Sequence, residues 1–191
     1  MKPLVETDWL LKNIKNVKII DASWHLPNSG RIAEEEFKKN HIEGSIFFDI
    51  EKHSKKNTTL PHMMPDAKNW QRVISSFGIN NEDHIIIYDN SSVYSSCRLW
   101  FSFIYFGHNT NLVSVLNGGF KKWLKESKKV TSLKTNYKKS DYRVNENKNL
   151  IFNRENVDQN IISKKYKLVD ARSKERFQGK IPEPRPGLKS G

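Results

Sequence analysis

Three consecutive isoleucines at residues 85–87 constrain the fold of this chain more than any other feature. Consecutive β-branched residues are typical of a strand that is buried on both faces of a parallel sheet. Small hydrogen-bonding residues follow at 90–96, and Trp100 and Ile104 then lie at helical spacing. A strand, a tight polar loop and a helix N-terminus form a natural anion site, and Cys97, the only cysteine, lies there.

The same alternation of apolar runs and helical patterns continues along the chain. Further strands are predicted at 17–22, 45–50 and 111–116, and helices at 7–14, 33–39, 66–77 and 120–125. Strands that alternate with helices imply a parallel α/β sheet with right-handed crossovers. Residues 51–65 show no periodicity and are predicted to form a long loop, which inside a compact domain is often functional.

An internal repeat indicates that a second domain begins near the end of the chain. Residues 166–172 repeat the pattern of residues 17–23, including its Asp-Ala pair, and each copy follows a short predicted helix. A repeat of this length indicates a duplicated domain. We predict a first domain at 1–126, a linker at 127–149 and the incomplete start of a second domain at 150–191. A single strand cannot form a sheet, so residues 173–191 are expected to be mobile.

The formal net charge of +12 at pH 7 invites a nucleic-acid interpretation. However, the lysines occur in pairs that are spread along the chain without interleaved aromatic residues. That pattern is typical of solvated surface, and no nucleic-acid partner is predicted.

The hydrophobic residues set further limits on the class of protein. They make up 36% of the chain, which is enough for a core. No run approaches the ~18 apolar residues of a membrane span, and the N-terminus lacks the apolar centre of a signal peptide. One cysteine forms neither an internal disulfide nor a cysteine zinc site. The pattern predicts a cytoplasmic protein without a membrane partner.

Short motifs occur in a consistent order over nearly the whole chain. They are residues 21–27, 30–31, 41–44, 47–50, 60–65, 88–89, 98–100, 106–108, 116–119, 176–179 and 182–187. Together they resemble the two-domain rhodanese-like sulfurtransferases, most closely the 3-mercaptopyruvate/thiosulfate branch. Glu43 stands where this family usually has proline, and Asn117 where it usually has aspartate.

The resemblance implies an α/β fold, a rhodanese-like parallel sheet of about five strands flanked by helices. It also implies that only the second domain carries the catalytic cysteine, in the loop after its central strand. In the first domain that position falls at Asp89, and an aspartate cannot carry a persulfide. A reactive Cys97 would need a pKa lowered by the helix N-terminus and Arg98. We expect instead that Cys97 is a small buried thiol.

Four candidate site residues follow from the resemblance. It implies that Arg176 and Arg185 hold the carboxylate and keto oxygen of 3-mercaptopyruvate, since a guanidinium fork binds a carboxylate in bidentate fashion. It implies that His62 and Glu51, the latter in place of the usual aspartate, assist from the first domain by moving the thiol proton. From the residues alone, solvated arginines and a structural loop histidine explain these positions as well.

The function implied by the resemblance is that of a sulfurtransferase. It would move sulfane sulfur from a small donor, 3-mercaptopyruvate or thiosulfate, through a cysteine persulfide to a thiol or cyanide acceptor. The 191 residues end before the expected cysteine loop, so the chain is expected to be an inactive fragment. The alternative is a rhodanese-like domain without chemistry that recognises a partner protein. No cofactor is predicted, and no spacing of His, Asp and Glu suggests a metal site.

Overall fold

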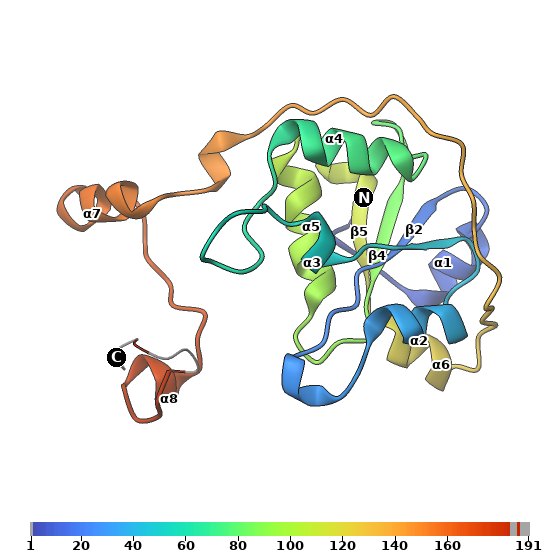
Figure 1. The fold of residues 1–191 in the computed structure, drawn as a ribbon, viewed down its shortest axis with the longest axis horizontal. Coiled ribbons are helices and arrows are strands. Elements are labelled where there is room, and N and C mark those ends of the chain that lie inside the picture. The colour runs from blue at the N-terminus through green and yellow to red at the C-terminus, as the bar shows by residue number, and fades with distance from the viewer. Residues whose placement is uncertain (1, 184–186, 188–191) are drawn as a thin grey trace. The chain divides into compact units, whose positions relative to one another are not determined.

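The central strand of the structure is β4, which contains the three isoleucines (Figure 1). The structure is a computed structural model that describes residues 2–183 and 187. All strand pairs are parallel, in the order β1-β5-β4-β2-β3. The strands are β1 (Leu4–Val5), β2 (Lys18–Asp21), β3 (Ser45–Phe47), β4 (Ile85–Tyr88) and β5 (Val113–Leu116). The predicted parallel α/β sheet of about five strands is confirmed. The very short β1 was not predicted from the sequence, because two residues show no periodicity.

Helices cover both faces of this sheet. They are α1 (Thr7–Asn13), α2 (Ala33–Lys39), α3 (Ile50–His53), α4 (Ala67–Ser76), α5 (Ser95–Tyr105) and α6 (Gly119–Lys125), with 3₁₀ turns at Pro27–Ser29, Thr110–Leu112 and Lys148–Leu150. Ile85 and Ile87 belong to the core cluster with α4 and α5, whereas Ile86 belongs to the cluster with α1 and α6. Since successive side chains of a strand point to opposite faces, the run of isoleucines supplies both cores.

Two predicted elements have different boundaries in the structure. The strand expected at 45–50 ends at Phe47, because Asp49 caps a short helix: its carboxylate accepts the Lys52 N–H at 3.1 Å. That helix, α3, occupies the first residues of the segment that was expected to be an irregular loop, residues 51–65. Glu51 therefore lies on a helix rather than on a loop.

The segment expected to be a linker, residues 127–149, packs against the sheet domain. Thr131 exchanges two backbone hydrogen bonds of 2.9 Å with His41, and the Ser140 N–H donates to the Ser75 carbonyl at 3.0 Å. Tyr142 is fully buried in the core cluster beside α5. Gly78 has φ 67°, and a Cβ there would lie 2.5 Å from the Lys138 carbonyl oxygen. The first compact unit accordingly extends to Leu150, while the predicted division into functional domains stays a prediction.

The second compact unit begins at Ile151 and contains α7 (Arg154–Ser163) and α8 (Lys174–Phe177). Asn153 caps α7 through a capping box with Asn156. The strand predicted at 166–172 is wrong, because these residues have no partner strand and form none. Val169 is 87% exposed. A strand requires hydrogen bonds from a neighbouring strand, and the described part of this unit supplies none.

Candidate active site at the carboxyl ends of the strands

His62 and Glu51 lie together at the carboxyl edge of the sheet. Nε2 of His62 is 2.7 Å from Oε1 of Glu51, which also accepts the indole N–H of Trp24 at 2.8 Å. The hydrogen bond from His62, followed by that from Trp24, holds the pKa of Glu51 below its usual value. An ionised Glu51 accepts the Nε2–H of His62 and so leaves Nδ1 of that ring as the proton acceptor. The pair can therefore hold and move a proton.

The backbone of His62 is held in position by Arg98. His62 has φ 55°, in the left-handed region, and its carbonyl accepts a 2.8 Å hydrogen bond from Nη2 of Arg98 in the first turn of α5. The Trp24 ring packs edge-on against the imidazole, with 4.9 Å between ring centroids. Burial lowers the pKa of the Arg98 guanidinium. A hollow of about 350 Å³ is lined by Trp24, Ile50, His62, Val93, Tyr94, Ser95 and Arg98.

These side chains come from three different crossovers. Trp24 follows β2, Glu51 follows β3, and Arg98 lies on α5 after β4. Parallel strands bring their carboxyl ends to one edge of the sheet, which is where ligands of open α/β folds bind. The sheet topology therefore explains why residues far apart in the sequence form one site.

In the loop after β4, backbone N–H groups donate hydrogen bonds to the side chain of Asp89, which belongs to the same loop. The buried Asp89 carboxylate accepts the N–H groups of Ser91 at 3.1 Å and Ser96 at 2.7 Å. The Asp89 carbonyl accepts the Phe120 N–H at 2.9 Å. Two of the backbone donors that could hold an external anion, one in this loop and one in the first turn of α5, are thus occupied by a side chain of the chain itself.

Asp21, at the end of β2, is a second buried carboxylate beside this loop. It accepts the Ser23 N–H at 2.8 Å and is 4% exposed. Burial raises the pKa of Asp21 from 3.8 to about 6, and the negative charge of Asp89 acts in the same direction. The folded protein therefore binds the Asp21 proton more tightly than the unfolded chain does.

A pH dependence of stability follows from the raised pKa of Asp21. Well above pH 6 this carboxylate is ionised in both states and the folded state bears its desolvation, whereas well below pH 4 it is protonated in both. Relative to Asp21→Asn, the wild type should lose about 2 kcal/mol of unfolding free energy between pH 4 and pH 7. Urea denaturation of both proteins at several pH values measures this difference. If the unfolding free energies of the two proteins change equally with pH, the raised pKa of Asp21 is contradicted.

In the second unit, Arg176 binds a carboxylate of the chain itself. Arg172 and Arg176 converge on Glu183, with Nη1 of Arg172 2.5 Å from Oε1 of Glu183. Arg172 also binds Asp170 through Nε and Nη2, at 2.8 and 2.7 Å. Nε of Arg176 is buried and has no hydrogen-bond partner among the described residues. Arg185 lies outside the described residues. Arg172 and Glu183 were not predicted as site residues. The available signals were that Arg172 follows the repeated Asp-Ala pair and that Glu183 lies between two prolines.

The comparison with protein families decides the classification of the sheet domain. A model of the rhodanese-like domain matches residues 6–126, from the end of β1 to the end of α6. The chain belongs to the rhodanese-like domain family.

Relatives of this rhodanese-like chain carry two names. It is 35% identical over 198 residues to 3-mercaptopyruvate sulfurtransferase of Mus musculus and 37% identical over 201 residues to thiosulfate sulfurtransferase of Rattus norvegicus. Each match covers 100% of this chain and 66% of the relative. SseA from Escherichia coli, a 3-mercaptopyruvate sulfotransferase of known crystal structure, is 28% identical to this chain. The two structures match with a TM-score of 0.86 over 98% of this chain and 72% of SseA.

The expectation that Cys97 is buried in this rhodanese-like domain is wrong. The side chain is exposed, and it lines a hollow of about 540 Å³ that also borders Asp89 and Lys121. α5 turns Leu99 and Phe103, which are one helical turn apart, into the core, and Cys97 lies on another face of the helix. Helical phase therefore outweighs the usual tendency of a free cysteine to be buried.

Three other histidines of the rhodanese-like domain have polar partners. His41 is buried and bonds the Phe37 and Leu133 carbonyls, and His108 bonds the Asp83 carbonyl. Nε2 of His25 lies 3.2 Å from Oε2 of Glu36.

Neither a metal cluster nor a membrane span is found in the described parts of the chain. No three His, Cys, Asp or Glu side chains among residues 2–183 and 187 could hold a metal ion together. No helix in the same residues is long and apolar enough to cross a membrane. The predicted cytoplasmic location stays a prediction.

Proposed function

We propose that this chain belongs to a sulfurtransferase that takes sulfane sulfur from 3-mercaptopyruvate or thiosulfate and passes it to a thiol or cyanide. The observation that carries the proposal is the 2.7 Å contact between His62 and Glu51 in a hollow at the carboxyl edge of the sheet. The names of the mouse and rat relatives support the same reaction class.

The nucleophile in this proposal is a cysteine of a second rhodanese-like domain, because Asp89 holds the corresponding position of the first domain. The cysteine thiolate bonds to the donor sulfur as the carbon–sulfur bond of 3-mercaptopyruvate breaks. The electron pair of that bond passes to the enolate of pyruvate. Nδ1 of His62 accepts the substrate's thiol proton and returns it to the enolate carbon, while Glu51 stabilises the protonated ring.

The donor carboxylate is assigned to the arginines of the second unit in this proposal. Arg176 already binds the Glu183 carboxylate through Nη2, which supports its ability to bind a small carboxylic acid. Arg185 is proposed as the second carboxylate and keto-oxygen ligand, on the resemblance alone.

A chimeric protein tests the proposal. The 191-residue chain should release no pyruvate from 3-mercaptopyruvate, because the proposed cysteine is absent from it. Its fusion to the remaining third of the mouse relative should release pyruvate, and should form thiocyanate when cyanide is present. A coupled lactate dehydrogenase assay measures the pyruvate.

The same assay can contradict the proposal in two ways. Pyruvate release by the unfused chain that disappears in Cys97→Ser would make Cys97 the nucleophile. A folded fusion without turnover, while the mouse enzyme is active under the same conditions, would remove the proposed role of this chain.

A second candidate function is a rhodanese-like module that recognises a partner protein without chemistry. The hydrogen bonds of Asp89 favour it, since this carboxylate uses two backbone donors that a reacting anion could otherwise bind. A first domain of this kind is compatible with catalysis in a second domain, and the fusion assay distinguishes the two cases.

A further inference from the structure

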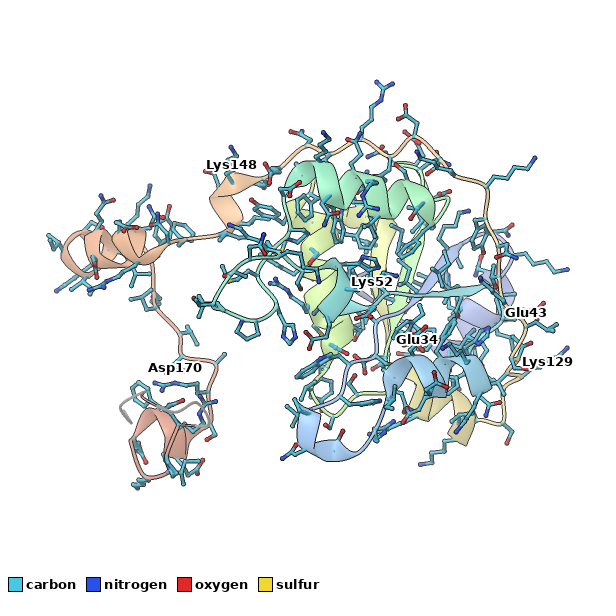
Figure 2. The ribbon with its side chains drawn as sticks, in the orientation of Figure 1. Glu34, Glu43, Lys52, Lys129, Lys148 and Asp170 are labelled. Atoms are coloured by element: carbon cyan, nitrogen blue, oxygen red, sulfur yellow. The ribbon has the colours of Figure 1, made fainter. Side chains whose placement is uncertain are left out.

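A groove of about 810 Å³ lies along the outer edge of the sheet, away from the loop that contains Asp89. Figure 1 shows the β3 segment passing between α4 and α2, and side chains of all three elements line the groove. Figure 2 labels two of the lining residues, Lys52 on α3 and Glu34 on α2. Neither His62 nor Glu51 lines this groove.

The floor of the groove has a free backbone edge. β3 is the last strand in the sheet order, and the Phe48 N–H donates to the Asp21 carbonyl of β2 at 2.8 Å. Hydrogen-bonding direction alternates along a parallel strand, so the N–H and C=O of Phe47 point away from β2. Thr131 pairs only with His41, so within the described chain the Phe47 backbone is left without a partner. Such an edge can accept one more strand.

Apolar side chains surround this edge. Phe37, Phe47 and Phe77 are each only half-buried and line the groove together with Ile46. The rings of Phe37 and Phe47 lie 5.5 Å apart between centroids. A strand laid along β3 would place an aliphatic or aromatic side chain against these rings and remove their apolar surface from water.

The charges around the groove select an acidic occupant. Lys52, Arg72 and Lys134 line it and form no ion pair with any described carboxylate. Glu34 is paired with Lys38 at 3.3 Å, and Asp49 is the other carboxylate in the lining. One carboxylate does not neutralise three cations, so the groove keeps a net positive charge. A second copy of this chain, with a formal net charge of +12, would be repelled. The complementary partner is therefore a different and acidic protein.

We propose that this groove binds an extended acidic segment of a partner protein. The segment adds a strand to β3 by pairing with the backbone of Phe47, places an apolar side chain on the three phenylalanines, and directs its carboxylates to Lys52, Arg72 and Lys134. This surface lies outside the proposed sulfur-transfer site and does not depend on that function.

A labelled peptide tests the proposal directly. The probe is fluorescein-labelled Glu-Asp-Val-Phe-Val-Asp-Glu, and fluorescence anisotropy of the probe with the 191-residue chain measures binding. We expect saturable binding that Lys52→Glu and Arg72→Glu each weaken about fivefold or more, because each reverses a charge beside the bound carboxylates. Lys148→Glu makes the same charge change on a residue that does not line the groove and should leave binding unchanged (Figure 2).

Backbone pairing has its own test that needs no variant protein. Two further peptides carry N-methyl groups, one peptide on its odd-numbered residues and the other on its even-numbered residues. In each peptide the N–H donors of one strand edge are therefore blocked. One of the two should bind about tenfold more weakly than the parent peptide, a loss of about 1.4 kcal/mol. The other peptide should bind as the parent does.

Three outcomes would overturn the proposal. The first is the absence of saturable binding at millimolar peptide. The second is an equal loss of affinity in Lys148→Glu and Lys52→Glu, which would indicate a diffuse charge effect. The third is unchanged binding of both methylated peptides, which would exclude strand addition to β3.

Discussion

Replacement of Tyr142 by alanine should lower the free energy of unfolding of the first unit by about 3 to 5 kcal/mol, the range for a large aromatic side chain in a core. Tyr142 is 0% exposed. Its ring stacks on His108 at 5.9 Å between centroids, and its hydroxyl lies 3.3 Å from Nδ1 of His108. The substitution leaves a cavity beside α5 and removes a buried hydrogen bond. Urea denaturation followed by tryptophan fluorescence measures the loss.

A matched control comes from the same segment. Leu133 is 77% exposed, and Leu133→Ala should change the unfolding free energy by less than about 0.5 kcal/mol. If Tyr142→Ala costs no more than Leu133→Ala, residues 127–149 do not contribute to the core. The result therefore also shows whether a protein ended at residue 126, where the family match stops, would lack part of its core.

His62→Gln in the chimeric protein should lower kcat for pyruvate release about 100-fold while the KM for 3-mercaptopyruvate changes little. Glutamine can still hydrogen-bond Glu51 but cannot take up a proton, so the substitution removes acid–base chemistry rather than binding. Steady-state assays over a range of substrate concentrations separate the two parameters.

The control for His62 is a histidine at the opposite end of the sheet. His84 directly precedes β4, whereas His62 lies at the carboxyl edge, and His84→Gln should leave kcat unchanged. A KM that rises while kcat stays constant in His62→Gln would assign the imidazole to substrate binding. Equal kcat values for His62→Gln and the wild type would exclude proton transfer by His62.

The strands of the sheet were predictable because their signal is local. Residues 85–87 alternate between two cores, so every side chain of the run is apolar, and the same holds more weakly for β2 and β5. The wrong prediction of a strand at 166–172 also comes from reliance on a local pattern. That apolar pattern matches β2, yet a pattern cannot supply the neighbouring strand that pairs with it.

The candidate site was predictable only through the resemblance. No periodicity relates His62 to Glu51, and neither Trp24 nor Arg98 was connected to them in the sequence. Their contact results from crossovers that bring the carboxyl ends of β2, β3 and β4 together. Exposed Cys97 could have been predicted from the phase of α5, since it is two residues from buried Leu99.

The sequence by itself determined the α/β class, the central strand and the aspartate, Asp89, that directly follows this strand, because these depend on residue type and short-range periodicity. Only the tertiary structure decided that Glu51 and His62 form a hydrogen bond, that residues 127–149 complete the core, and that the edge of β3 stays open. Each of these depends on contacts between residues distant in the sequence, and such contacts are set by how the chain crosses the sheet rather than by any local pattern.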